Sequence, residues 1–206
     1  MHEPHRSPEA WPEGGATGAK LALRDQLLTA RRRRSLAEVA EAARAIAEHL
    51  LAAEEVRRAA VVACYASVGA EPGTSLLLDR LRDDGKRVLL PVVLPDYDLD
   101  WAPYAGPASL LPAGRGLLEP AGQRLGVDAV TTADVVLVPG LAVSPAGMRL
   151  GRGAGCYDRA LARVPVGTFT CVLLYEEETG VEVPFEPHDR SVAAAVTPAE
   201  LVRFQQ

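Results

Sequence analysis

The sequence predicts an α/β fold built around a mostly parallel sheet. An apolar, β-branched run of strand length covers Ala59–Tyr65, and it is followed by a loop, a helix that reaches Asp84 and a second strand at 87–94. Strands joined in this way lie parallel, with the helix as the crossover between them. The same fold class is indicated by three later runs of strand length, at 134–138, 168–175 and 191–196.

Length and composition are those of an ordinary globular protein. The chain has 206 residues, of which 48% are hydrophobic and 24% charged, and its net charge is −5. An acidic balance argues against general nucleic-acid binding, which needs a basic face. No apolar run approaches the roughly 20 residues of a membrane-spanning helix. The cysteines form no C-x-x-C pair, which is typical of a reducing compartment, so we expect a cytoplasmic protein that binds neither nucleic acid nor membrane.

Two regions of different character divide the chain. Residues 1–18 are polar, rich in glycine and proline and without periodicity, so we expect a disordered N-terminal tail. Residues 19–206 carry the apolar patterns and are expected to form a single domain, acting as a monomer.

A helical pattern begins at Lys20, with Leu23 and Leu27 on its apolar side. At about 100° per residue, the cations Lys20, Arg24 and Arg31 fall within roughly 40° of one another on one face. Such a face is either solvated or directed at an anion.

A second helix follows at once. Ser35 and Glu38 form a capping box, and apolar residues then recur at helical spacing as far as Leu50.

Beyond the second predicted strand, turn residues divide the chain into short elements. Residues 99–104 contain a proline and are expected to form a short edge strand. Residues 110–120 are expected to form an ordered loop. Near the end of the chain, Thr197 and Glu200 form a capping pattern with Pro198 between them, so we expect a short terminal helix.

Glu71 lies in the loop that follows the strand at 59–65. Ligands of parallel sheets gather at the carboxyl ends of the strands, which makes Glu71 a candidate ligand-binding carboxylate. The alternative is a loop carboxylate that interacts only with the dipole of the helix after it.

A glycine-rich loop follows the strand at 134–138. Gly151, Gly153 and Gly155 free the backbone to adopt positive φ and to bring its N–H groups close to a bulky ligand, while Arg149 and Arg152 add positive charge. The spacing is neither that of the dinucleotide fingerprint nor that of the Walker A loop. A glycine-rich surface turn therefore remains the alternative to an anion site.

The helix expected at 155–163 would direct its N-terminal N–H groups and its dipole at the same anion. Asp158 would repel bare phosphate, but it is well placed if a divalent cation bridges it to phosphate oxygens. The loop thus predicts a nucleotide-phosphate site with a metal ion.

Taken together, these segments resemble the 5-formyltetrahydrofolate cyclo-ligase family, also called methenyltetrahydrofolate synthetases. The resemblance runs from about Lys20 to Thr197 and depends on the order and spacing of several motifs, namely Lys20-x-x-x-Arg24, Glu71-x-x-Thr74, Gly85-Lys86, Gly116-Leu117-x-Glu119-Pro120, Asp134–Gly140, Arg149–Arg159 and His188-Asp189. It implies a three-layer α/β/α fold with a mostly parallel sheet, similar to sugar-phosphate isomerases and coenzyme A transferases.

The resemblance also implies a reaction. The γ-phosphoryl group of ATP would pass to the formyl oxygen of 5-formyltetrahydrofolate in a Mg²⁺-dependent step. N10 would then attack the activated carbon, and phosphate would leave as 5,10-methenyltetrahydrofolate forms. The small-molecule partners would be ATP and a reduced folate.

Site residues follow from the resemblance motif by motif. The residues implied to bind ATP are Lys20, Arg24, Arg149, Leu150, Gly151, Arg152, Gly153, Ala154, Gly155, Cys156 and Tyr157. Those implied to bind the folate are Ala66, Glu71, Arg152 and Tyr157, and those implied to hold Mg²⁺ are Asp158 and Asp189. Glu71 has a chemical reason for its role, because a pterin edge presents a ring N–H beside an amino group, and one carboxylate can accept both.

Two positions depart from the family pattern. Ala154 stands where glycine or lysine is usual, and Cys156 stands where the first of two tyrosines is usual. Alanine would remove positive-φ freedom, and cysteine would remove an aromatic face and a hydroxyl. A helix N-terminus can also activate a thiol, although phosphoryl transfer needs no protein nucleophile. The alternatives are therefore a related enzyme acting on another formyl or amide substrate, and a non-catalytic folate- or nucleotide-binding module.

Overall fold

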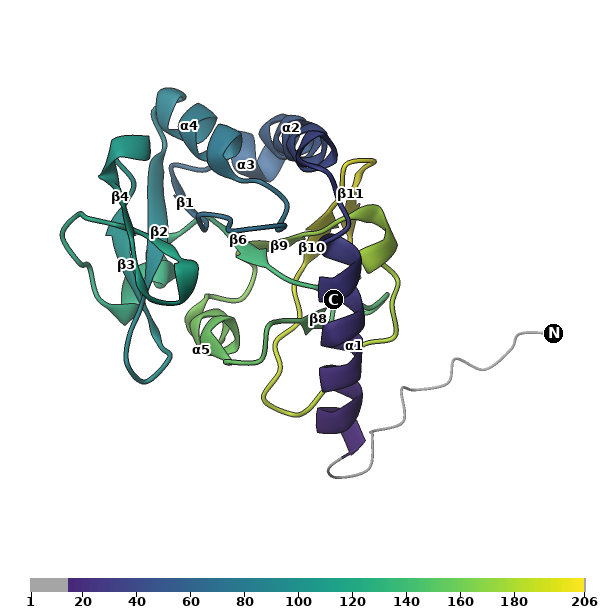
Figure 1. Cartoon of the computed structure of the whole chain (residues 1–206). Coiled ribbons are helices and arrows are strands. Elements are labelled where there is room, and N and C mark those ends of the chain that lie inside the picture. Colours follow the sequence, from purple (N-terminus) through teal and green to yellow (C-terminus); the bar gives the residue numbers. More distant parts are fainter. Residues whose placement is uncertain (1–14, 206) are drawn as a thin grey trace.

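The computed structural model describes residues 15–205 of the chain. A seven-stranded sheet with the order β11-β10-β9-β6-β1-β2-β3 crosses its centre (Figure 1). The strands are β1 (Val61–Ala63), β2 (Arg87–Val93), β3 (Leu99–Pro103), β6 (Val135–Pro139), β9 (Phe169–Leu173), β10 (Ala194–Val196) and β11 (Leu201–Arg203).

The inner strands β10, β9, β6, β1 and β2 pair in parallel, and β3 and β11 close the two edges as antiparallel strands. The prediction of a mostly parallel sheet is therefore confirmed, as is the edge position of the proline-containing strand. Strand β6 shows why the inner strands read as unbroken apolar runs. Val135 and Leu137 face one hydrophobic cluster, while Val136 and Val138 face the other, so both faces of the strand are buried.

Helices cover both faces of the sheet and make three layers (Figure 1). Helices α2 (Leu36–Ala52), α3 (Glu54–Arg58) and α4 (Ser75–Asp83) lie over one face. Helix α5 (Cys156–Arg163) and the 3₁₀ helix η3 (Val127–Thr132) cover the other. The predicted capping box of α2 is present, since the Glu38 amide donates to the Ser35 hydroxyl over 3.2 Å and the Ser35 amide donates to the Glu38 carboxylate over 2.7 Å.

Helix α1 (Gly15–Arg31) lies outside these layers, beside the small ribbon formed by β7 (Ala142–Val143) and β8 (Arg149–Leu150). Its apolar side chains pack in a separate cluster, which includes Leu27 and Leu150. The helix begins earlier than the sequence predicts, so residues 15–18 of the expected tail are helical, and residues 1–14 lie outside the described part of the chain.

A buried ion pair fastens the end of α1. Arg31 is only 2% exposed, and its guanidinium donates to the two carboxylate oxygens of Glu178 over 2.7 and 2.8 Å and to the carbonyl of Gly140 over 2.7 Å. Arg31 thus has a structural role away from the cavity that the two other cations line. Glu178 belongs to the 3₁₀ helix η4 (Glu176–Glu178).

Two expectations about local structure are wrong. The segment expected to be a loop at 110–120 is an antiparallel hairpin of β4 (Leu110–Pro112) and β5 (Leu118–Pro120), preceded by η1 (Pro107–Ser109) and turned at η2 (Gly114–Gly116). The expected terminal helix is strand β11, because the free edge of β10 offers its backbone groups to the returning chain. Within the described residues, no helix is both long and apolar enough to cross a membrane.

Candidate functional site

A cavity of about 450 Å³ opens beyond the carboxyl ends of β1 and β6. These two strands lie side by side, while the chain continues from β1 to β2 on one side and from β6 to β9 on the other. Such a switch point is where parallel sheets bind ligands, and the volume is typical of a small-molecule pocket. All residues that the sequence predicts for the site line this one cavity, namely Lys20, Arg24, Ala66, Glu71, Arg149, Leu150, Gly151, Arg152, Gly153, Ala154, Gly155, Cys156, Tyr157, Asp158 and Asp189.

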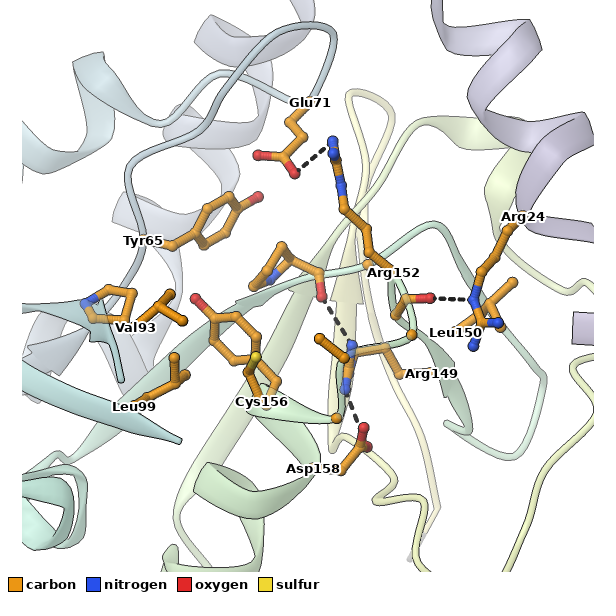
Figure 2. A pocket seen from close by; sticks show the side chains of 18 of the residues that line it. Arg24, Tyr65, Glu71, Val93, Leu99, Arg149, Leu150, Arg152, Cys156 and Asp158 are labelled. Atoms are coloured by element: carbon orange, nitrogen blue, oxygen red, sulfur yellow. Dashed lines mark hydrogen bonds and ion pairs between the residues drawn. The ribbon is translucent and has the colours of Figure 1, made fainter. Parts of the chain in front are cut away.

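The glycine loop takes a conformation that needs its glycines. Gly153 has a φ of 103° and Gly155, the N-cap of α5, has a φ of 69°. Added Cβ atoms would be strained at both positions. Ala154 is not among the residues with positive φ, so alanine there costs no backbone strain. Arg24 braces the loop from α1, because its Nε donates to the Gly151 carbonyl over 2.9 Å (Figure 2).

Arg149 is a buried cation at the base of this loop. Its guanidinium donates to the Pro139 carbonyl over 3.2 Å and to Oδ1 of Asp158 over 3.1 Å (Figure 2). The Arg190 amide donates to the same Asp158 oxygen over 3.2 Å. Two donors thus hold the Asp158 carboxylate at the start of α5, close to the segment that contains Asp189.

Lys20 meets that segment from the other side. Its ammonium group donates to Oε2 of Glu186 over 2.8 Å and to Oδ2 of Asp189 over 2.6 Å. Burial on its own lowers the pKa of Lys20, but the hydrogen bonds to Asp189 and Glu186 outweigh burial and raise it. The hydrogen bond from Lys20 in turn lowers the pKa of Glu186. Ligand atoms of Glu186, His188 and Asp189 lie within 4.8 Å of one another, so the cluster could hold a metal ion.

Glu71 lines the same cavity and contacts the glycine loop. Its side chain is buried, and Oε2 accepts the Val68 amide over 3.0 Å. Oε1 lies 3.0 Å from a guanidinium nitrogen of Arg152 (Figure 2). Because the Arg152 side chain is 54% exposed, it can leave Glu71 at little cost when another donor arrives.

One part of the cavity wall is apolar and aromatic. Pro91 and Val93 come from β2, Leu99 from β3, and Leu117 and Leu118 from the hairpin of β4 and β5. The pKa of Tyr157, which lies beside them, is raised well above its ordinary value, chiefly by burial. Such a wall can bind a flat aromatic ligand.

The remaining position of interest in the loop is Cys156. The side chain is half-buried, and this burial raises the pKa of the thiol despite the opposing effect of Arg159. A thiol activated by the helix N-terminus is therefore not what the structure shows. The departure from tyrosine leaves a small, neutral group in the cavity wall.

The lining residues that sequence reasoning did not single out include Tyr65, Arg115 and Glu186. Tyr65 could have been suspected, since it ends the expected strand that leads to Glu71. Glu186 lies three residues before Asp189 and could have been grouped with it. Arg115 carries no local signal, because the hairpin that brings it to the cavity was not expected.

Comparison with known proteins agrees with this geometry. The family model described as the 5-formyltetrahydrofolate cyclo-ligase family matches residues 16–198. A 5-formyltetrahydrofolate cyclo-ligase of Mycolicibacterium smegmatis is 42% identical over 142 residues, which cover 66% of this chain and 73% of that protein. An Escherichia coli K12 protein of the same name is 32% identical over 148 residues, covering 68% of this chain and 79% of its own length.

Solved structures show the same relationship. The NMR structure of the Aquifex aeolicus 5,10-methenyltetrahydrofolate synthetase superimposes with a TM-score of 0.78 at 26% identity, covering 91% of this chain and 93% of that one. The Mycoplasma pneumoniae 5,10-methenyltetrahydrofolate synthetase shares the fold, with a TM-score of 0.70 at 20% identity, covering 87% of this chain and 98% of that one. On these matches, and with a cavity lined by the motif residues, the chain belongs to the 5-formyltetrahydrofolate cyclo-ligase family of enzymes.

Proposed function

We propose that this chain converts 5-formyltetrahydrofolate to 5,10-methenyltetrahydrofolate and consumes ATP in a Mg²⁺-dependent reaction. The observation that carries the proposal is that one cavity is lined by the glycine loop with its two arginines, by a buried carboxylate and by an apolar wall. An anion site alone would fit any nucleotide-binding module. The buried carboxylate adds the means to recognise a flat heterocycle with paired N–H donors.

The ATP end of the cavity would be the glycine loop and the residues that brace it. Backbone N–H groups at the start of α5 point toward this region, and the helix dipole favours an anion there. Arg149 is held by Pro139 and Asp158, so its charge is positioned before the nucleotide binds. Lys20 and Arg24, which line the same cavity, would add charge from α1.

The chemistry of the donor set fits Mg²⁺. Asp158 and Asp189 supply carboxylate oxygens, the hard ligands that this ion prefers, and we propose that they hold it. Glu186 shares its lysine partner with Asp189 and is a further candidate ligand. Bound there, the ion would neutralise charge on the phosphate oxygens during phosphoryl transfer.

The folate end of the cavity would be organised by Glu71. The carboxylate can accept the ring N–H and the amino group of the pterin once Arg152 moves aside. Ala66 and Tyr157 line the cavity next to it and would pack against the ring. The apolar residues of β2, β3 and the hairpin would bind the rest of the aromatic substrate.

The work of the protein in this reaction is positioning and charge neutralisation. The cavity would hold the formyl oxygen in line with the γ-phosphoryl group, and the oxygen would attack phosphorus as ADP leaves. N10 would then attack the activated carbon and lose its proton to solvent, and the carbon–oxygen bond would break to release phosphate. No protein nucleophile enters this sequence, in keeping with the raised pKa of the Cys156 thiol.

The test is absorbance in the methenyltetrahydrofolate band with 5-formyltetrahydrofolate, ATP and Mg²⁺, each omitted in turn, and with EDTA. A signal that requires all three components is the expected result. A chain that binds ATP but gives no signal would instead be a related enzyme with another formyl or amide substrate, and one that binds ligands without turnover of any would be a binding module.

We further propose that the enzyme acts as a cytoplasmic monomer. All three cysteines are free, which fits a reducing compartment. Light scattering on a size-exclusion column tests the monomer, and a dimer at micromolar concentration would contradict it.

A further inference from the structure

Tyr65 has a hydroxyl group whose role the fold does not explain. The residue lies two positions beyond the end of β1 and lines the cavity, and only 4% of its surface is exposed. Among the described residues, the hydroxyl has no hydrogen-bond partner. Buried hydroxyl groups are nearly always paired, because an unpaired one loses its bonds to water and gains nothing. The partner of a group at the wall of a ligand cavity is therefore most simply supplied by the ligand.

The neighbours of Tyr65 indicate which kind of atom that partner is. Figure 2 shows the ring beside Glu71, with the hydroxyl directed toward the same space as the Glu71 carboxylate and Arg152. Glu71 can only accept hydrogen bonds when ionised, whereas a tyrosine hydroxyl can donate one. This wall of the cavity thus places a donor next to a pair of acceptors.

The polar edge of a 2-amino-4-oxo pyrimidine ring presents the complementary order. Its amino group and ring N–H are adjacent donors, and the carbonyl oxygen beside the N–H is an acceptor. We propose that Tyr65 is a specificity-determining residue of the folate subsite, donating a hydrogen bond to this ring carbonyl while Glu71 accepts from the two donors. The inference rests on the proposed function, since it assumes that a pterin occupies this end of the cavity.

Two features separate this role from a merely structural one. A structural hydroxyl would have a protein partner. The hydroxyl of Tyr104, a residue that does not line the cavity, has one, because it donates to the Asp79 carboxylate over 2.9 Å. Tyr65→Phe removes only the unpaired hydroxyl and keeps the ring in the core. We therefore expect Tyr65→Phe to leave the melting temperature unchanged or slightly raised, and the matched control Tyr104→Phe to lower it.

The test is calorimetric binding of two ligands to the wild-type chain and both variants. One ligand is 5-formyltetrahydrofolate, and the other is its 4-amino-4-deoxy analogue, in which the ring carbonyl is replaced by an amino group. Tyr65→Phe should weaken binding of the 4-oxo ligand about tenfold, as expected for one lost hydrogen bond, and change binding of the 4-amino ligand and of ATP less than twofold. Tyr104→Phe should leave all three affinities unchanged.

The inference is overturned if Tyr65→Phe binds the 4-oxo ligand as the wild type does, or if it weakens both folates equally. A wild-type chain that binds no reduced folate would refute the proposed function, and this inference with it. A wild-type chain that binds folate without turnover would refute only the catalytic proposal, because the binding comparison can still be made.

Discussion

Glu71→Gln is the sharpest test of how this cavity would recognise its substrate. Oε2 of Glu71 accepts the Val68 amide over 3.0 Å, whereas Oε1 faces Arg152. A glutamine at this position would keep its side-chain oxygen on the Val68 side. In the opposite rotamer, the glutamine NH₂ group would face the Val68 N–H, which is also a donor. Its NH₂ group would therefore point into the space where the pterin donors are expected.

The size of the effect follows from this orientation. Hydrogen bonds to a charged partner contribute about 1.5–3 kcal/mol each. Glu71→Gln loses at least one of them and places a donor opposite a donor, so we expect a loss of about 3 kcal/mol, or roughly 100-fold in affinity. The cost to stability should be small, because the Arg152 side chain that loses its partner is 54% exposed, and such a pair contributes about 1 kcal/mol at most.

The assay is initial rates with the folate varied at saturating ATP, followed by ATP varied at saturating folate. We expect the KM for the folate to rise about 100-fold and the KM for ATP to change less than threefold. The matched control is Glu119→Gln, because Glu119 also lines the cavity and, like Glu71, uses one oxygen to accept a backbone amide, that of Val93 over 2.9 Å. A Glu71→Gln enzyme whose folate KM stays within threefold of the wild type would refute the assignment of Glu71 to the pterin.

Three further predictions concern the metal, the loop and the fold. Asp158→Asn should lower Mg²⁺-dependent turnover more than tenfold, about 1.4 kcal/mol of transition-state stabilisation; an unchanged rate in a Mg²⁺ titration would contradict the metal assignment. Gly153→Ala should weaken ATP binding roughly tenfold, because a φ of 103° costs a side chain about 1–3 kcal/mol, whereas Ala154→Gly should change it less than twofold, and calorimetry that finds both variants alike would count against the loop. Glu178→Ala should cost about 3–5 kcal/mol of unfolding free energy, since it leaves the Arg31 guanidinium buried without its carboxylate partner, and a urea midpoint close to that of the wild type would disprove this.

The sheet and its covering helices could be predicted from the sequence because their signals are local. Apolar β-branched runs on strands such as β6 reflect burial on both faces, and the capping box of Ser35 and Glu38 lies within one turn of helix. The glycines that free the loop backbone are likewise visible without a structure, and Gly153 and Gly155 do take positive φ.

Other local signals were compatible with more than one structure, and tertiary packing decided which one formed. The capping chemistry expected near Thr197 is real, because its hydroxyl accepts the amides of Ala199 and Glu200 over 3.2 Å. It closes a turn instead of a helix, because β10 has a free edge and the next residues pair with it. A backbone takes the hydrogen-bond partners that the tertiary structure supplies, which no short pattern reveals.

Helix α1 likewise combines a feature that the sequence predicts with one that only packing decides. Its three cations share one face, as the sequence predicts, but Lys20 and Arg24 line the cavity while Arg31 is buried against Glu178. Periodicity determines which side chains point the same way, since it depends only on backbone geometry. Which of them meets a carboxylate more than 140 residues away depends on how α1 packs against the β7–β8 ribbon, and only the folded chain decides that.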